Sequence, residues 1–260
     1  KSSVPLSIDV KGQLTQSTFN VSLGDNLSFF GVLEHDINHF SRAHLVLGED
    51  KMLLPTNGFH ISTTLAQADF NLWQPLISDI IDTISTSETP ISAKELVNDS
   101  PSLFSTPERI RGNVEQLELL GQTLNNVSFN LFDQKNWWLL ELNAKETRSR
   151  IKFYPDWLTQ GVDVKADFLH LKTSVKKKEG VVAQETDTPV EEQSNVFDNL
   201  PKIVLQCDEC KLDELNLGEV NLSLIRRAKD IIEIERFTGK RKQAHFNLSG
   251  QWQKNDEVNV

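Results

Sequence analysis

The stretch that decides the fold is VEQLELLGQTLNNVSFNL, residues 114–131, because it recurs as CDECKLDELNLGEVNLSL at residues 207–224. Apolar residues match at seven positions, and the residues between them are mostly polar in both copies. The matched residues are Val114, Leu117, Leu119, Leu124, Val127, Phe129 and Leu131 in the first copy and Cys207, Cys210, Leu212, Leu217, Val220, Leu222 and Leu224 in the second. A repeat that keeps an alternating apolar face and little else predicts a sheet built by reiterating one set of strands.

The same alternation runs through most of the chain and predicts further strands. Its clearest runs are Phe19/Val21/Leu23, Leu27/Phe29/Gly31/Leu33, Leu45/Leu47 and Phe59/Ile61/Thr63/Leu65. Turn-forming residues lie between these runs, at residues 24–26, 48–50 and 56–58. We interpret them as hairpin connections, too short for crossover helices. The predicted fold is mainly β: an elongated, strongly twisted antiparallel sheet curled into a groove, with a short helical insertion.

Two segments depart from the strand pattern. From Asn71 to about Ser87, Trp73 and a series of Leu and Ile residues recur at the spacing of an amphipathic helix. From Lys176 to about Asn199 the chain has neither periodicity nor enough apolar residues to offset its ordering entropy. We therefore predict β-groove segments at 1–70, 109–175 and 200–260, a helical insertion at 71–108 and a flexible loop at 176–199.

Composition excludes several classes of function. The net charge is −10, whereas nucleic-acid binders usually concentrate Lys and Arg on one face. No apolar run approaches the roughly 20 residues that cross a bilayer as a helix. The chain begins inside a strand-like run, so we expect it to be a piece of a longer polypeptide whose membrane anchor lies outside it.

The two cysteines, Cys207 and Cys210, suggest redox or zinc chemistry at first sight. A thioredoxin-type pair needs a helix N-terminus, and zinc needs two further ligands, neither of which follows from the sequence. In the repeat these cysteines occupy the positions of Val114 and Leu117. They are therefore expected to be buried structural thiols or a local disulfide, and a disulfide would need a bulge or turn between them.

Other candidate sites have weaker support. His35, His39, His44 and His60 invite a metal hypothesis, but we expect them to be solvated loop residues. Trp137 and Trp138 would point to opposite faces if residues 136–143 form a strand. No catalytic triad, nucleophile elbow, phosphate-binding loop or cofactor motif is found, so no catalytic residue is assigned. A hydrolase of an envelope polymer remains an alternative only because paired carboxylates are common.

The order of several short segments resembles the AsmA-like family. The segments are LPTNGFHI (54–61), ADFNLW (68–73), LPKI (200–203), LGEVNL (217–222) and LSGQW (248–252). The resemblance covers most of the chain. It implies a protein anchored in the inner membrane of Gram-negative bacteria and extending through the periplasm as a long β-groove that carries phospholipid toward the outer membrane. It also implies envelope partner proteins, and no catalytic residues.

The residues agree with this expectation for a physical reason. An apolar sheet face must be covered by a second sheet, a helix or a ligand, and one short helix covers little. Phospholipid acyl chains are the expected ligand, and the alternative is a structural or scaffolding module closed by its own elements. The expected lipid-facing residues are Phe19, Val21, Leu23, Phe29, Val127, Phe129, Leu131, Leu140, Val220, Leu222 and Leu224.

Overall fold

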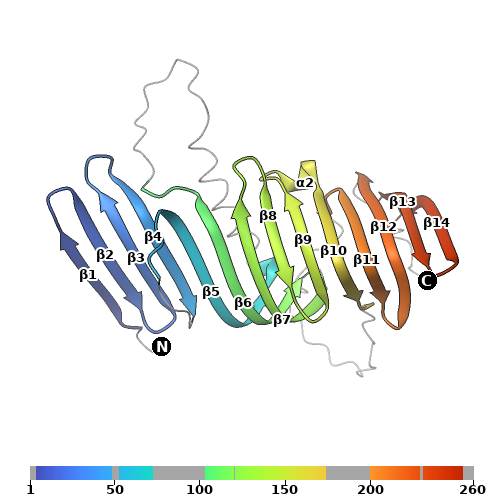
Figure 1. The fold of residues 1–260 in the computed structure, drawn as a ribbon, viewed down its shortest axis with the longest axis horizontal. Coiled ribbons are helices and arrows are strands. Elements are labelled where there is room, and N and C mark those ends of the chain that lie inside the picture. The colour runs from blue at the N-terminus through green and yellow to red at the C-terminus, as the bar shows by residue number, and fades with distance from the viewer. Residues whose placement is uncertain are drawn as a thin grey trace, which may run out of the picture. The chain divides into compact units, whose positions relative to one another are not determined.

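The protein is mainly β (Figure 1), as seen in a computed structural model that describes residues 4–48, 53–72, 103–119, 121–173, 200–228 and 231–253. The chain divides into two compact units, one of residues 1–119 and 123–145 and the other of residues 120–122 and 146–260. Within each unit, the strands are hydrogen-bonded in the order in which they occur in the sequence. This confirms the predicted fold class of an open, mainly antiparallel sheet.

Unit 1 contains eight of the described strands. They are β1 (Leu6–Gly12), β2 (Gln16–Leu23), β3 (Leu27–Glu34), β4 (His39–Gly48), β5 (Gly58–Asp69), β6 (Pro107–Leu119), β7 (Gln122–Asp133) and β8 (Trp138–Asn143). Unit 2 contains six described strands and a single helical turn. They are β9 (Thr147–Phe153), α2 (Trp157–Gln160), β10 (Val162–Leu171), β11 (Ile203–Leu212), β12 (Leu215–Ala228), β13 (Ile231–Arg241) and β14 (Ala244–Gln253).

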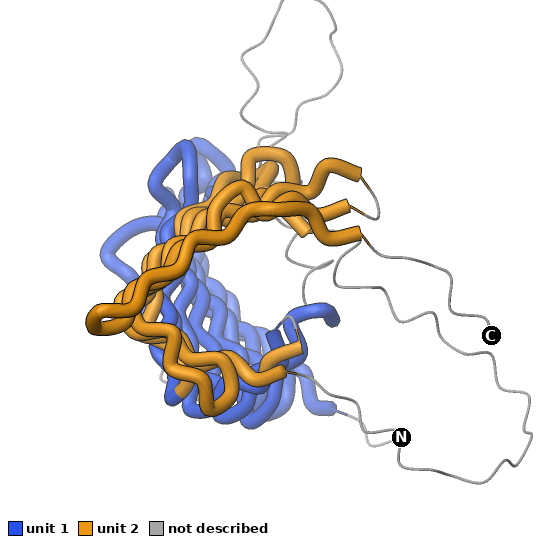
Figure 2. The backbone as a smooth tube through the Cα atoms, turned by 90° about the vertical axis from the view of Figure 1, so that its right-hand side faces the viewer, with its two compact units in different colours: residues 1–119, 123–145 blue, residues 120–122, 146–260 orange. Residues whose placement is uncertain are grey.

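The sheet of unit 2 is curved. Its strands bend along their length and overlie one another as a crescent in Figure 2. Side chains on the inner side of such a bend converge, so tightly packed clusters are expected there, whereas side chains on the outer side diverge. Apolar residues of unit 2 form a cluster in which Ala166, Cys207, Cys210 and Val220 are buried.

Three strand pairs are parallel, and for the connection between β4 and β5 the expectation of a hairpin was wrong. They are β4–β5, β5–β6 and β10–β11. Gly48 and Gly58 flank a crossover, because Arg42 pairs with Gly58 and Gly48 pairs with Thr64. The chain must return about 20 Å, at about 3.3 Å per residue, from the end of β4 to the start of β5. An extended connection of residues 49–57 reaches about 30 Å, so no helix is needed.

The two predicted irregular segments fall mostly on parts of the chain that the structure does not describe. Residues 70–72 are helical, but the rest of the predicted amphipathic helix lies outside the described residues. The predicted loop at 176–199 also lies outside them. Strand β6 begins at Pro107. The division of the chain into groove segments, insertion and loop therefore stays a prediction.

The sequence repeat corresponds to two equivalent hairpins, β6–β7 in the first copy and β11–β12 in the second. Each copy contributes its matched residues to an apolar cluster. In unit 1, Val114, Leu124 and Val127 are buried in one cluster, with Leu117, Leu119 and Phe129 packed against it. In unit 2, Cys207, Cys210 and Val220 are buried in the other, with Leu217 and Leu222 against it. The alternation that defined the repeat is thus the alternation of core-facing side chains.

Candidate functional site

One face of unit 1 collects the residues expected to form an apolar track. Residues directly opposite each other on paired strands share a face, so the register places each track residue. The longest row crosses six strands, from β1 to β6, and consists of Ile8, Val21, Phe29, Leu45, Ile61 and Ile110. A parallel row holds Val10, Phe19 and Gly31, and another holds Leu6, Leu23 and Leu27. We call this surface the apolar face of unit 1.

The predicted residues on β7 and β8 also lie on this face. Leu131 lies opposite Leu140, and Phe129 lies opposite Leu142. Phe129 and Leu142 belong to the same cluster as Leu65 of β5 and Val114 of β6. Because Leu65 pairs with Val114 and Thr63 with Gly112, the apolar rows continue across these strands. Every residue of unit 1 predicted for the track therefore lies on one face.

This face is only partly covered. At its β1 edge, Leu6, Ile8 and Val10 are exposed by 61%, 59% and 49%. Phe19 and Val21 on the next strand are half-buried, and Val127 within the cluster is 2% exposed. The apolar face thus grades from exposed side chains at the β1 edge to fully buried ones at the hairpin β6–β7.

Aromatic rings lie on the part of the face formed by β2 to β5, and the expected lipid-facing residues did not include three of them, Phe40, Phe59 and Phe104. Phe40 stacks on Phe104 with ring centroids 4.8 Å apart, and Phe29 and Phe59 contact Phe104 at 5.8 and 5.5 Å. Strict alternation from Leu45 places Phe40 on the polar face. A bulge between Val32 and Leu33 shifts the register and returns Phe40 to the apolar face. Phe59 lies in the alternating run of β5, and this alternation is the sequence signal that could have placed it on the apolar face.

Glycines allow these rings to lie close to the sheet. A Cβ on Gly31 would fall 2.7 Å from the ring of Phe40, and a Cβ on Gly112 would fall 2.7 Å from the ring of Phe129. Neither distance is possible for real carbon atoms without a shift of the ring. The rings therefore occupy the space above the glycine backbones, an arrangement in which an aromatic side chain covers a strand glycine.

Unit 2 has an apolar face of its own. Its rows are Val162–Ile203–Leu224–Ile234, Val164–Leu205–Leu222–Phe237–Leu248 and Ala166–Cys207–Val220–Gly239. The three track residues predicted for this unit, Val220, Leu222 and Leu224, therefore lie in three adjacent rows of one face. Leu248 and Trp252 on β14 are exposed by 55% and 44%. Here too, the apolar face is buried within its cluster and exposed toward the final strand.

The two cysteines form a disulfide on this face. Their Cα atoms are 5.9 Å apart, and the pairing of β11 with β12 shifts register between Cys207 and Cys210. The bulge that a disulfide was predicted to need is therefore present. Cys207 is 1% exposed and Cys210 is 5% exposed, so the bridge is part of the core.

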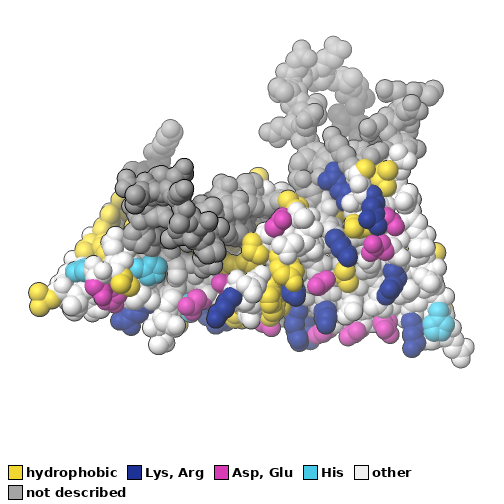
Figure 3. Space-filling view, turned by 90° about the horizontal axis from the view of Figure 1, so that it is seen from above, with side chains coloured by type: hydrophobic (Ala, Val, Ile, Leu, Met, Phe, Trp, Pro, Cys, Tyr) yellow, Lys and Arg dark blue, Asp and Glu magenta, His cyan; other side chains and the backbone are white. Residues whose placement is uncertain are grey.

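The opposite faces carry polar residues together with some apolar ones, such as the buried Val32 and Val46 in unit 1. Adjacent residues on a strand point to opposite faces, so Asn20, Asn130, Glu141 and Asn221 lie away from the apolar rows. In Figure 3, Lys, Arg, Asp and Glu side chains are interspersed over the surface in view, with hydrophobic side chains gathered in patches between them. Each unit thus separates a continuous apolar face from a more polar one.

Two of the histidines, His44 and His60, differ from their prediction as solvated loop residues. His44 lies within β4 and is 2% exposed, and His60 lies within β5. His35 is exposed in a turn, where its Nε2 lies 2.8 Å from the Ser17 hydroxyl. Among the described residues, no group of three or more His, Cys, Asp or Glu side chains is arranged to hold a metal ion.

The adjacent tryptophans also differ from expectation. Strand β8 begins at Trp138, so Trp137 lies in the preceding turn, where its carbonyl accepts a hydrogen bond from the Gln134 amide. Trp138 is 6% exposed and shares the strand side of Leu140 and Leu142. Strand β8 is therefore shorter than the predicted strand of residues 136–143, so the expectation that the two tryptophans point to opposite faces of one strand does not apply.

Comparison with known proteins places the chain in one family. The model of the family described as YhdP protein matches residues 1–260. No curated protein matches the chain, and no solved structure does. Within the part of the chain that the structure describes, no helix is both long and apolar enough to span a bilayer.

Proposed function

The chain belongs to the YhdP family, and from this premise we propose that it is a periplasmic segment of an AsmA-like, bridge-type lipid transporter. In this proposal phospholipid moves along the apolar faces of the two units between the inner and outer membranes. The chain performs no catalysis. A region outside it holds the whole protein in the inner membrane.

The observation that carries the proposal is the unbroken row of apolar side chains across β1 to β6. Exposed apolar patches of this continuity mark binding surfaces in soluble proteins, whereas scattered hydrophobic residues do not. Each methylene group of an acyl chain gains about 0.8 kcal/mol on leaving water. An aliphatic row offers this gain equally at each strand, so a lipid has no strong preference for one position.

The disulfide supports an extracytoplasmic location. Disulfides persist in oxidising compartments such as the bacterial periplasm and are rare in the cytosol. The bridge between Cys207 and Cys210 is buried in the core of unit 2, which makes it a structural element of the fold.

A scaffolding function is a second candidate, and the buried clusters favour it. Val127 and Val220 are each 2% exposed, so those parts of the two faces are already closed by protein side chains. If the half-buried rows are closed by other parts of the longer protein in the same way, no lipid is needed to cover them.

Site-specific photocrosslinking tests the proposal. A photoreactive phenylalanine analogue would replace Leu140 or Leu222 on the apolar faces, and Glu141 or Asn221 on the polar faces. Each control is adjacent to its test position and points to the opposite side of the same strand. The variants would be irradiated in cells of a Gram-negative bacterium and the purified products analysed for attached phospholipid by mass spectrometry.

Transport predicts phospholipid adducts at Leu140 and Leu222 and none above background at Glu141 and Asn221. Equal labelling at both members of a pair would mean non-specific contact with membranes. Protein–protein adducts at Leu140 and Leu222 without lipid would support the scaffold instead.

A further inference from the structure

The apolar face of unit 1 consists of three rows that differ in how far the chain itself covers them. All three cross β1 to β6, and the register places one residue of each strand in each row. The first row is Val10, Phe19, Gly31, Ala43, Phe59 and Pro107; the second is Ile8, Val21, Phe29, Leu45, Ile61 and Ile110; the third is Leu6, Leu23, Leu27, Leu47, Thr63 and Gly112.

The first row is closed by aromatic rings of the chain. Its members on β3 and β4, Gly31 and Ala43, are buried, and Ala43 is 0% exposed. The ring of Phe40 lies over Gly31 and is itself only 9% exposed. Phe104 stacks on Phe40 with the two ring planes 9° apart, and it is 37% exposed. Phe104 is therefore the outer ring of the stack that covers this row.

A backbone hydrogen bond holds Phe104 at this position. Phe40 precedes Arg42, the residue of β4 that pairs with the first residue of β5. The N–H of Phe40 donates to the carbonyl of Leu103 at 3.0 Å. The chain thus passes beside the start of β4 before it enters β6. Its Phe104 ring contacts Phe29 and Phe59 as well as Phe40.

The third row is open on the early strands and closed on the later ones. Leu27 and Leu47 are half-buried on β3 and β4. Thr63 on β5 is only 8% exposed, and Gly112 on β6 is buried. The ring of Phe129 occupies the space above Gly112. A ligand lying in the third row would therefore be blocked at β5 and β6.

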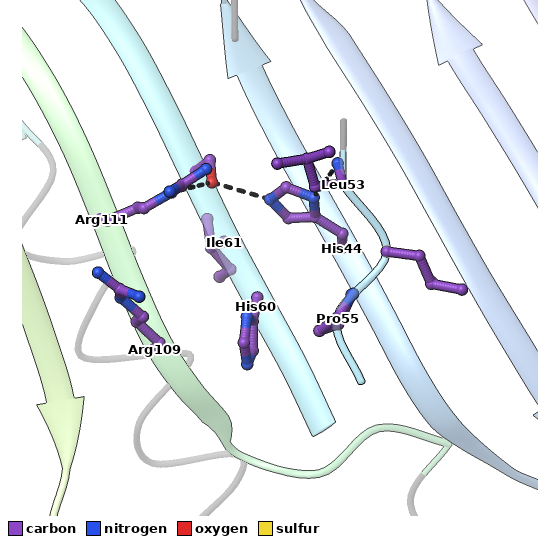
Figure 4. Close-up of a pocket in the computed structure, with 9 residues that line it drawn as sticks. His44, Leu53, Pro55, His60, Ile61, Arg109 and Arg111 are labelled. Atoms are coloured by element: carbon purple, nitrogen blue, oxygen red, sulfur yellow. Dashed lines mark hydrogen bonds between the residues drawn. The ribbon is translucent and has the colours of Figure 1, made fainter. Parts of the chain in front are cut away.

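The second row is accessible on all six strands. Ile8 is 59% exposed, and every other member from Val21 to Ile110 is half-buried. Next to Ile61 on β5, Ser62 points to the opposite side of the sheet. There the Ser62 hydroxyl is hydrogen-bonded to His44 at 2.8 Å and to Arg111 at 3.0 Å (Figure 4). The second row is thus an aliphatic path, with one aromatic ring, between two covered rows.

We propose that an acyl chain on unit 1 lies along the second row and that Phe104 is the positioning residue that keeps it off the first row. This inference rests on the proposed function and adds to it the path of the acyl chain. Six strands at about 4.8 Å spacing span about 24 Å. The hydrocarbon core of a bilayer is about 30 Å thick and holds two chains end to end, so one chain needs about 15 Å. The second row is long enough for it.

Intermolecular nuclear Overhauser effects (NOEs) between palmitate and the chain test the proposal, because they arise only between protons in near contact. The chain would be deuterated except at Ile methyl groups and Phe rings. Ile61 and Ile110 report on the second row, and Phe40 reports on the first. The test variant is Phe104→Ala. The matched controls are Leu103→Ala, which keeps the carbonyl that bonds Phe40, and Phe104→Tyr, which keeps the ring.

We expect saturable binding of palmitate, with NOEs to Ile61 and Ile110, in the wild-type chain and in all three variants. NOEs to Phe40 should be absent in the wild-type chain and in both controls. They should appear in Phe104→Ala, because the ring that covers Phe40 is gone. If Phe104→Ala does not fold, Phe104→Leu, which keeps an apolar side chain without the ring, should show weaker NOEs to Phe40.

The possible failures can be told apart. NOEs to Phe40 in the wild-type chain, or saturable binding without NOEs to Ile61 and Ile110, would overturn this inference and leave the proposed function standing. The same holds for an unchanged NOE pattern in a folded Phe104→Ala or Phe104→Leu variant. Absence of saturable binding would refute acyl-chain binding by this chain, and the proposed function would fall together with the inference.

Discussion

Truncation of the two equivalent valines, Val127→Ala and Val220→Ala, tests whether the sequence repeat is also a repeat of packing energy. The two residues are matched positions of the repeat and are each 2% exposed. Val127 packs in the cluster of Val114 and Leu142. Val220 packs in the cluster of Cys207 and its neighbours in unit 2.

The expected destabilisation follows from the atoms removed. Each substitution deletes two buried methyl groups, and the transfer free energy is about 0.8 kcal/mol for each. The clusters lie on hydrogen-bonded strands that cannot close the space completely, so a cavity term adds to the loss. We expect about 2–3 kcal/mol at each position. At the half-buried pair Leu131→Ala and Leu224→Ala, solvent fills the space, and about 1 kcal/mol is expected.

Urea denaturation with hydrogen-exchange mass spectrometry provides the measurement. Exchange in peptides of β6–β7 reports on unit 1, and exchange in peptides of β11–β12 reports on unit 2. This separation matters because two units need not unfold in one transition. The wild-type chain and the two leucine variants serve as references in the same experiment.

The reasoning would be refuted by either of two results. If the losses of unfolding free energy in Val127→Ala and Val220→Ala differ by more than about 1.5 kcal/mol, equal burial does not reflect equal packing. The repeat is then a repeat of sequence pattern and not of packing energy. If the leucine variants lose as much stability as the valine variants, the graded coverage of the apolar faces is wrong.

Three further predictions concern single features. Gly112→Ala should destabilise the fold by about 1–3 kcal/mol, because its Cβ would lie 2.7 Å from the ring of Phe129. Gly250→Ala should leave the stability unchanged, because nothing lies within 4 Å of its Cβ. A melting temperature that is unchanged in both variants would contradict this. Replacing Cys207 and Cys210 together by Ala should cost about 2 kcal/mol from the short closed loop alone, and thiol titration of the native chain should find no free thiol before reduction. The pKa of His60 is lowered mainly by burial, so its contribution to the free energy of unfolding should be complete above the unfolded pKa of about 6.5 and should decline as the pH falls below that value. The substitution His60→Gln should flatten this decline in thermal melts from about pH 5 to 7.5. An unchanged slope would exclude His60 as its cause.

The apolar faces could be predicted from sequence because they depend on local periodicity. Alternation at Phe19, Val21 and Leu23 determines which side of a strand is apolar, and neighbouring strands then align their apolar sides. The repeat also placed Cys207 and Cys210 in the core, since it matched them with Val114 and Leu117. That inference needed no knowledge of how the strands are connected.

The strand connections and the contacts between polar side chains of neighbouring strands could not be predicted in the same way. Turn-forming residues such as Gly48 occur both in hairpins and at the start of crossover connections. Which of the two forms depends on whether the next strand begins beside the end of β4 or beside its start, and local sequence does not specify this. The bulge at Val32 and Leu33 has no distinct sequence signal, so Phe40 was not expected on the apolar face. His44, Ser62 and Arg111 come from three strands, and only a parallel register brings them together.

The sequential strand order also has a mechanical consequence. Most hydrogen-bonded neighbours within a unit are joined directly in the chain, so tension applied to the two ends of a unit loads one pair of strands at a time. Hydrogen bonds pulled in this way break successively, as in a zipper, at lower force than bonds sheared together. We expect each unit to extend strand by strand under load, with the disulfide between Cys207 and Cys210 limiting the extension of β11.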